Sequence, residues 1–178
     1  ILSVEKLRGL ADIVIDNDLA LISDEIYKDI MFDDMEHTSP ASLPGMKERT
    51  VIVDGVAKSY AMTGWRIGWS IGPAEVISGI GSLQSQQTSN ANSIAQWATV
   101  EALTGPQEAV GDMASAFEQR RDYVVDALRQ IPGVECAMPH GAFYAFPDIS
   151  SFFGKTLRDS PINSSQDLTN YLLQTAHV

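Results

Sequence analysis

Short, uninterrupted apolar runs that alternate with helical periodicity are the feature that most constrains the fold of this chain. Residues 19–23 read LALIS and residues 50–55 read TVIVDG. Such runs are typical of strands that are buried on both faces of a sheet. Residues 3–16 instead place their apolar side chains at helical spacing, with Ser3 as the predicted N-cap. A helix followed by a buried strand predicts a layered α/β fold.

The later residues continue this alternation of helical and strand-like segments. Pro132 and Gly133 end the longest helical pattern, and the sequence changes character around this point. We therefore divide the chain into two domains, residues 1–125 and residues 126–178. Further helices are predicted over residues 74–84, 92–103, 107–130 and 167–175, and further strands over residues 66–72, 134–138 and 142–147.

The acidic balance of the chain argues against two classes of partner. Its 178 residues include 12 basic and 23 acidic side chains, for a formal net charge of -11. Such a surface repels the phosphate backbone of a nucleic acid, and it repels an anionic membrane for the same reason. No apolar run approaches the roughly 20 residues of a transmembrane helix, and no stretch reads as a secretory signal. We expect a cytoplasmic protein.

Few residues carry the thiol and imidazole groups that zinc sites commonly use. Cys136 is the single cysteine, so it cannot form a disulfide within the chain, and we expect a small buried thiol. The three histidines, His37, His140 and His177, show no metal-ligand spacing with one another or with Cys136. The sequence therefore predicts neither a metal centre nor a catalytic histidine.

Residues 53–68 place a lysine and an arginine beside a predicted buried strand. The stretch reads VDGVAKSYAMTGWRIG and contains Lys58 and Arg66. Most lysines are solvated surface residues, but ligands of α/β sheets bind beyond the carboxyl ends of the strands. A desolvated lysine has a lowered pKa, so its free amine can attack a carbonyl and form a Schiff base. Arg66 is either a structural ion-pair residue or a planar fork that binds phosphate.

An acid and a phenol follow the first predicted strand, in the motif ISDEIY. If the chain turns helically there, Asp24 and Tyr27 share one side of the turn. Asp24 is then either a helix N-cap or a carboxylate for a cationic ring nitrogen. Tyr27 is either a half-buried packing aromatic or a donor to a ring oxygen. With Lys58 and Arg66, these residues would suit pyridoxal 5′-phosphate (PLP). They offer an amine for its aldehyde, a carboxylate for its ring nitrogen, a donor for its ring oxygen and a guanidinium for its phosphate.

On these motifs the chain resembles the class I/II aminotransferases, the aspartate aminotransferase fold type of PLP enzymes. The segments ISDEIY, VDGVAKSYAMTGWRIGWSIGP and PHGAFYAFPDIS follow the family's order, and SIAQWATVEAL resembles the bacterial aspartate and prephenate aminotransferase subgroup. The resemblance implies a three-layer α/β/α large domain that binds PLP, present in part as residues 1–125. It implies that residues 126–178 begin a smaller α+β C-terminal domain.

The resemblance also implies a role for each candidate residue. Lys58 would form the Schiff base with PLP, Asp24 would pair with the ring nitrogen, and Tyr27 would hydrogen-bond the ring hydroxyl. Arg66 would bind the cofactor phosphate. Phe143 would lie near the substrate, although core packing is an equal alternative for this residue.

One segment departs from the family pattern, and another resembles it. The family often has a hydroxyl residue three positions before the lysine, where this chain has Gly55, and Ala57 directly precedes the lysine. Backbone groups or Ser59 would then have to replace those phosphate contacts. Residues 86–93, QQTSNANS, resemble a segment that reaches the neighbouring subunit's site in the family's homodimer, or form a polar loop before a helix.

The resulting functional hypothesis is a PLP-dependent transaminase that acts on amino acids, aspartate, glutamate or aromatic ones, and on 2-oxo acids. The alternatives are another enzyme of the same fold type, such as a lyase or synthase, and a cofactor-binding sensor domain of a transcription regulator. A cofactor-free interaction domain is the third alternative. The family's asparagine at the ring hydroxyl and its substrate-carboxylate arginine are expected before Ile1 and beyond Val178. We therefore expect a fragment of a longer enzyme.

Overall fold

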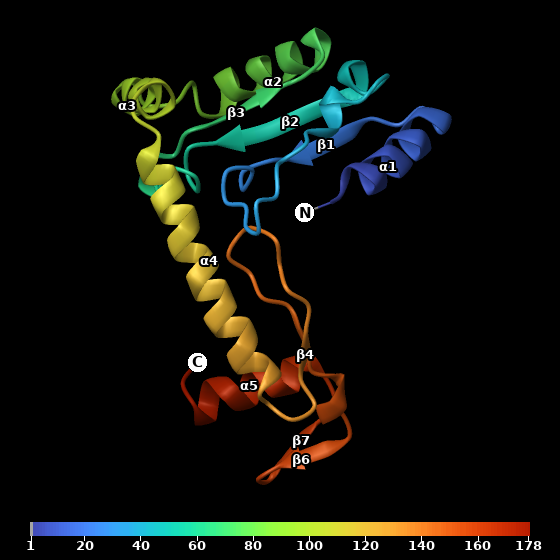
Figure 1. Cartoon of the computed structure of the whole chain (residues 1–178). Coiled ribbons are helices and arrows are strands. Elements are labelled where there is room, and N and C mark those ends of the chain that lie inside the picture. The colour runs from blue at the N-terminus through green and yellow to red at the C-terminus, as the bar shows by residue number, and fades with distance from the viewer. Residues whose placement is uncertain (1) are drawn as a thin grey trace. The chain divides into compact units, whose positions relative to one another are not determined.

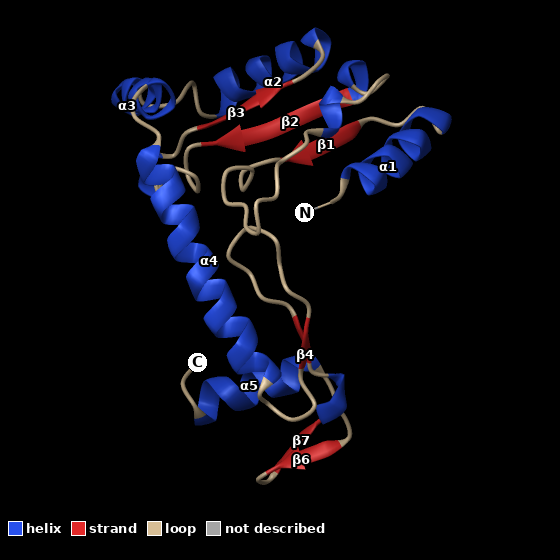
Figure 2. Ribbon diagram, viewed as in Figure 1, coloured by secondary structure: helices blue, strands red, loops and turns tan. Residues whose placement is uncertain are grey.

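The described chain forms two compact units. The structure is a computed structural model, and it describes residues 2–178. The first unit contains the residues up to Phe117 together with His140–Ala142, and the second contains Glu118–Pro139 and Phe143–Val178. Figures 1 and 2 show the helices and strands of both units. The combination of helices and small sheets is the mixed α/β structure that the sequence predicts.

The first unit is built on a three-stranded mixed sheet. Strand β1 (Leu21–Asp24) pairs in parallel with β2 (Thr50–Gly55), and β2 pairs antiparallel with β3 (Gly68–Ile71). Asp24 lies opposite Val53, and Gly55 lies opposite Gly68. The predicted strands over residues 19–23, 50–55 and 66–72 are confirmed as elements. Their register brings the carboxyl ends of β1 and β2 to one edge of the sheet.

Helix α1 (Val4–Asp16) covers part of this sheet and forms the core with it. The Ser3 hydroxyl accepts the N–H of Lys6, so the predicted N-cap is confirmed. Buried Ala11 and Val14 contact Met46, and Leu21 of β1 packs against this cluster. The expectation that both faces of these strands are buried is wrong within the described residues, because Ile22 on the opposite face of β1 is 74% exposed.

The connection between the two parallel strands contains short helices only. Two 3₁₀-helices, η1 (Pro40–Ser42) and η2 (Lys47–Arg49), follow a turn-rich segment, and a third, η3 (Thr63–Trp65), lies between β2 and β3. The Ser39 hydroxyl caps η1 by accepting the N–H of Ala41. Short 3₁₀ pieces of this kind are common as connectors.

Three longer helices follow the sheet. They are α2 (Ala74–Gln87), α3 (Ser93–Thr104) and α4 (Glu108–Arg129), and their predicted bounds are confirmed to within three residues. Asn92 caps α3, since its side-chain oxygen accepts the N–H groups of Ile94 and Ala95. Helix α4 continues from the first unit into the second. The division between the units follows Phe117, and the predicted domains, residues 1–125 and 126–178, stay a prediction.

The second unit contains two small antiparallel pairs and the last helix. Strand β4 (Glu135–Cys136) pairs with β5 (Pro147–Asp148), and β6 (Lys155–Leu157) pairs with β7 (Ser160–Ile162). Helix α5 (Ser165–Thr175) confirms the predicted last helix. The predicted strand over residues 134–138 is confirmed as β4. The predicted strand over residues 142–147 overlaps β5 only at Pro147, so its bounds are wrong.

The β6–β7 hairpin has no clear sequence signal. Its loop consists of Arg158 and Asp159, and Arg158 adopts a left-handed conformation with φ 50°. Two-residue hairpin loops usually contain an Asn-Gly or Asp-Gly pair, and the Arg158–Asp159 loop contains neither. Among residues 2–178, no helix has both the length and the apolar character needed to cross a membrane.

Candidate functional site

The strand topology collects the candidate residues at one edge of the sheet. Because β1 and β2 are parallel, the residues that follow them leave the sheet on the same side. Asp24 is the last residue of β1, and Lys58 comes shortly after Gly55 at the end of β2. Arg66 precedes β3, which starts opposite Gly55. This is the edge at which open α/β sheets bind ligands.

Lys58 lies next to Tyr27 at this edge. The side chain is half-buried, and its Nζ atom lies 5.8 Å from the centroid of the Tyr27 ring. Two backbone bonds hold the turn: the N–H of Tyr60 donates to the carbonyl of Val56 at 3.3 Å, and that of Ala61 donates to the carbonyl of Lys58 at 3.1 Å. A cation at this distance from an aromatic face is attracted by the ring.

Asp24 and Tyr27 belong to a turn, which we call the Asp24 turn (residues 24–29). The Oδ1 atom of Asp24 accepts the N–H of Ile26 at 3.2 Å, and the Asp24 side chain is exposed. The helix N-cap alternative is wrong, because a turn and not a helix follows Asp24. Asp24 and Tyr27 both line one cavity of about 390 Å³.

Arg66 lines a different cavity, of about 840 Å³, together with Trp65, Gly68 and Asn92. Its Nη1 atom donates to the carbonyl of Thr63 at 3.0 Å, and the residue is exposed. Arg66 also has a left-handed backbone, with φ 55°. Such a conformation costs a residue with a side chain about 1–2 kcal/mol, and strained residues cluster at functional sites.

The structure explains why a glycine occupies position 55, which the sequence did not reveal. A Cβ atom at this position would lie 2.7 Å from the carbonyl oxygen of Ile67 and 3.0 Å from the Cα of Gly68. The absence of a side chain at Gly55 therefore allows β2 to approach β3 closely. With this backbone, a hydroxyl residue at the position would not fit without a shift of the neighbouring strand.

Phe143 belongs to the second unit, where its ring lies 5.2 Å from that of Tyr144 between centroids. The residue is 42% exposed, so full core packing does not describe it. Its predicted place near a substrate stays a prediction.

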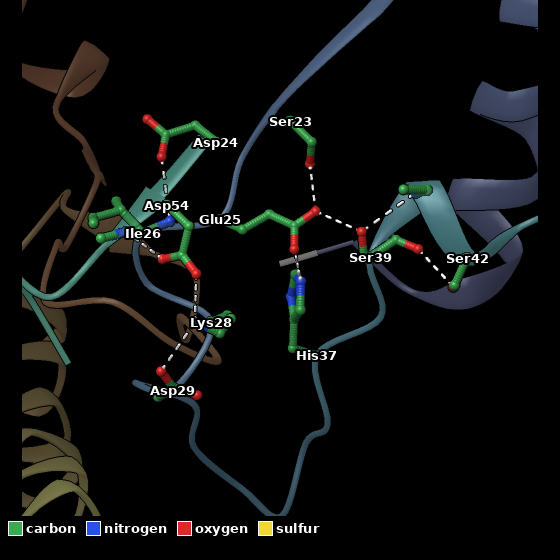
Figure 3. A network of polar contacts seen from close by, with 12 residues as sticks. Ser23, Asp24, Glu25, Ile26, Lys28, Asp29, His37, Ser39, Ser42 and Asp54 are labelled. Atoms are coloured by element: carbon green, nitrogen blue, oxygen red, sulfur yellow. Dashed lines mark hydrogen bonds and ion pairs between the residues drawn. The ribbon is translucent and has the colours of Figure 1, made fainter. Parts of the chain in front are cut away.

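Sequence reasoning missed a buried carboxylate in the Asp24 turn. Glu25 is 6% exposed, and its carboxylate accepts the hydroxyls of Ser23 at 3.0 Å and Ser39 at 2.7 Å. The Nε2 atom of His37 lies 2.9 Å from the second oxygen. Figure 3 shows how this network ties the turn to the segment before η1. A buried charge is tolerated when hydrogen bonds surround it.

A second missed group consists of Lys28, Asp29 and Asp54. Lys28 Nζ lies 2.5 Å from Asp54 Oδ2 and 3.4 Å from Asp29 Oδ2. Burial by itself lowers the pKa of Lys28. The hydrogen bond to Asp54 and the charges of Asp29 and Asp54 outweigh it, so the pKa of Lys28 is raised. The one visible signal was an acid, Asp54, inside an apolar run.

The side chains at this edge match the groups of PLP by type. They offer an amine, a phenol, a carboxylate and a guanidinium, which suit an aldehyde, a ring oxygen, a ring nitrogen and a phosphate. In addition, the Ser59 hydroxyl is 1% exposed and has no hydrogen-bond partner among residues 2–178. Within the same residues, no cluster of three or more histidine, cysteine or acidic side chains could hold a metal ion.

Comparison with curated proteins gives close relatives. The chain is 51% identical over 137 residues to an aspartate/prephenate aminotransferase of Cereibacter sphaeroides, covering 76% of this chain and 34% of that protein. It is 46% identical to an aspartate aminotransferase of Pinus pinaster, covering 98% of this chain and 36% of that one. The chain thus spans little more than a third of the length of these relatives.

Solved structures have the same fold over the whole chain. The aspartate aminotransferase from Rhizobium meliloti matches with a TM-score of 0.95 and 40% identity, covering 99% of this chain and 45% of that one. The aromatic aminotransferase from Pyrococcus horikoshii matches with a TM-score of 0.90 and 35% identity, covering 100% and 46%. The family model "Aminotransferase class I and II" matches residues 1–178. The chain therefore belongs to the class I and II aminotransferase family and has part of the aminotransferase fold.

Proposed function

We propose that this chain is part of a PLP-dependent aminotransferase that moves an amino group between an amino acid and a 2-oxo acid. The observation that carries the proposal is the position of Lys58, a half-buried residue whose Nζ atom lies 5.8 Å from the centroid of the Tyr27 ring at the edge where two parallel strands end. Membership of an aminotransferase family that uses PLP supports it. The proposal includes the predicted arrangement of a three-layer large domain and a smaller C-terminal domain.

Four side chains would hold the cofactor. Lys58 would bind its aldehyde carbon, and the Tyr27 hydroxyl would donate to its ring oxygen. The Asp24 carboxylate would keep a proton on its ring nitrogen, since an adjacent anion favours the charged form. The Arg66 guanidinium, although it lines a different cavity from Asp24 and Tyr27, would bind its phosphate, aided by the Ser59 hydroxyl, which has no hydrogen-bond partner among residues 2–178.

Lys58 would also carry the proton transfer. When bound, PLP supplies an electron sink that makes the α-proton of an amino acid acidic. The amine of Lys58 would take this proton from the α-carbon as a general base and deliver it to the cofactor carbon as a general acid. The Tyr27 ring would keep the amine close to that position. The Asp24 carboxylate would not move a proton in this scheme.

The relatives suggest the substrate class. Curated proteins with similar sequences act, by their names, on aspartate and prephenate, and a similar solved structure is that of an aromatic aminotransferase. We propose that the substrate is an acidic or aromatic amino acid.

We also propose a homodimer, because Ile94 and Trp97 on α3, just after residues 86–93, are 71% and 75% exposed. Phe143 would lie near the substrate.

The test uses the longest natural chain that contains these residues. After incubation with PLP and reduction with borohydride, mass spectrometry should find the cofactor attached to the peptide that contains Lys58. Aspartate should then be converted to its 2-oxo acid, and Lys58→Ala should lower this rate by about 10²–10⁴-fold. The exposed Lys47 serves as the control, since Lys47→Ala should change neither result.

Three outcomes would contradict the proposal. Attachment of the cofactor to another lysine would remove Lys58 from its role. Binding without turnover of any amino acid would favour a sensor domain, and a product other than a 2-oxo acid would favour a lyase or synthase of the same fold type.

A further inference from the structure

A charged bridge joins the segments that follow β1 and β2. Lys28 directly follows Tyr27 in the Asp24 turn, and its Nζ atom donates to Asp54 Oδ2 at 2.5 Å. Asp54 lies in β2, shortly before Lys58. Figure 3 shows Lys28 between the carboxylates of Asp54 and Asp29. We propose that the Lys28–Asp54 ion pair is a positioning element that holds the segments carrying Tyr27 and Lys58 in one relative geometry.

Both oxygens of the Asp54 carboxylate are engaged. One accepts the Lys28 ammonium, and the other accepts the N–H of Gly55 at 2.7 Å. The Asp54 side chain is 6% exposed, whereas that of Lys28 is 31% exposed. A buried carboxylate held at both oxygens has one orientation, so the cation that it binds is held too. Removal of the cation would leave a buried, unpaired charge, which is strongly unfavourable.

The charges of this bridge also act on the turn that carries Lys58. Burial raises the pKa of the Tyr60 phenol, and the charges of Asp29 and Asp54 raise it further, while the Lys28 charge lowers it. The Tyr60 hydroxyl donates to Gln107 Oε1 at 2.9 Å, and this bond holds the phenol in place. Tyr60 therefore reports on the bridge from the Lys58 side.

The inference rests on the proposed function, because it gives the ion pair a purpose at the site of Lys58 and Tyr27. Proton transfer requires the amine and its target in one geometry, and a displacement of about 1 Å can cost 10²-fold in rate. Lys28 and Asp54 would act through Lys58 and Tyr27, and neither is proposed to touch the substrate. They are positioning residues.

The main experiment compares amide hydrogen exchange in the longest natural chain without cofactor. Lys28→Met retains a long, unbranched side chain and removes its charge. We expect exchange about tenfold faster at Ile30, whose N–H donates to Tyr27, and also at Tyr60 and Ala61 after β2. Amides of α1 should keep their rates. The matched control is Lys6→Met, which removes the same charge from an exposed position of α1.

The results separate positioning from simple structural support. Lys28→Arg restores the cation and should return the rates toward those of the wild type. Faster exchange at Ile30 alone would show that the ion pair acts only on its own turn, and equally faster exchange in α1 would show a general loss of stability. Either result would overturn the inference. If Lys28→Met does not fold, Asp54→Asn breaks the same pair while retaining an acceptor for Gly55, and it is judged in the same way.

A spectroscopic measurement and a kinetic one complete the test. Titration of tyrosinate absorbance, compared with Tyr60→Phe, should show that Lys28→Met raises the pKa of Tyr60; an unchanged pKa would contradict the inference. With cofactor, Lys28→Met should lower kcat about tenfold and leave the substrate KM within about twofold. The two proposals fail differently. If Lys28→Met speeds exchange at Ile30, Tyr60 and Ala61 but the cofactor does not attach to Lys58, the proposed function is refuted. If the cofactor attaches to Lys58 but exchange does not change at these amides, the positioning role is refuted.

Discussion

The Nζ atom of Lys58 lies 5.8 Å from the ring centroid of Tyr27, although the two residues follow different strands. The parallel pairing of β1 and β2 explains the contact, because both strands end at the same sheet edge. The aromatic face attracts the ammonium group, and Tyr27 lines the same cavity as Asp24. This contact links an amine to a phenol, as the proposed chemistry requires.

The first prediction tests this contact. Tyr27→Leu removes the aromatic face and should lower the free energy of unfolding by about 1 kcal/mol more than Tyr27→Phe, which keeps the face. Urea denaturation measures the difference. Repeating both changes in a Lys58→Met background should remove most of it. An equal difference in both backgrounds would show that packing, and not the cation, accounts for the effect.

The second prediction concerns alkaline pH. The folded-state pKa of Lys28 is raised above 10.5, so the folded state holds the proton more tightly than the unfolded state. The resulting stability is fully present below pH 10.5 and is lost as the pH rises through the folded-state pKa. Above pH 10.5, the free energy of unfolding should therefore fall more steeply in the wild type than in Lys28→Met.

This comparison needs one correction for Tyr60. The pKa of Tyr60 is also raised, so it titrates in the same direction at alkaline pH. Both proteins should therefore carry Tyr60→Phe. Urea denaturation at pH values below and above 10.5, the ordinary pKa of lysine, gives the slopes. Identical slopes with and without Lys28 would contradict the raised pKa.

The third prediction concerns the buried Glu25 network. Glu25→Ala leaves the donors of Ser23, Ser39 and His37 without their acceptor, and it should lower the free energy of unfolding by about 3 kcal/mol. Glu25→Gln keeps an oxygen for both serine hydroxyls and should cost about 1 kcal/mol. The control is Glu48→Ala at an exposed position of η2, which should stay within about 0.5 kcal/mol. Similar losses for all three variants would contradict the network.

The fourth prediction compares two glycines. Gly55→Ala places a methyl group 2.7 Å from the carbonyl oxygen of Ile67 and should destabilise the chain by about 1–3 kcal/mol. Gly79 lies inside α2, where an added Cβ meets nothing within 4 Å. Gly79→Ala should therefore stabilise the chain by about 0.5–1 kcal/mol. Thermal denaturation followed by circular dichroism distinguishes the signs, and a neutral Gly55→Ala would show that β3 can move away.

Local patterns account for the parts of the fold that the sequence predicts. The N-cap bond of Ser3 joins residues three positions apart, so its motif is visible in the sequence. The helical periods of α1 and α4 are local in the same sense. The motifs around Lys58 and Arg66 are likewise contiguous, which is why their family resemblance could be stated and the comparisons could confirm the family.

By itself, the sequence determined the α-helices, the three strands of the first sheet, the family and the candidate residues Lys58, Asp24, Tyr27 and Arg66. Only the tertiary structure decided that Glu25 meets Ser39 across 14 positions and that Lys28 meets Asp54 across 26. It also decided that a side chain at position 55 would lie too close to the backbone of Ile67 and Gly68 at the start of β3. The physical reason is that such contacts depend on strand register, which is set by the packing of the whole unit and by no single local segment.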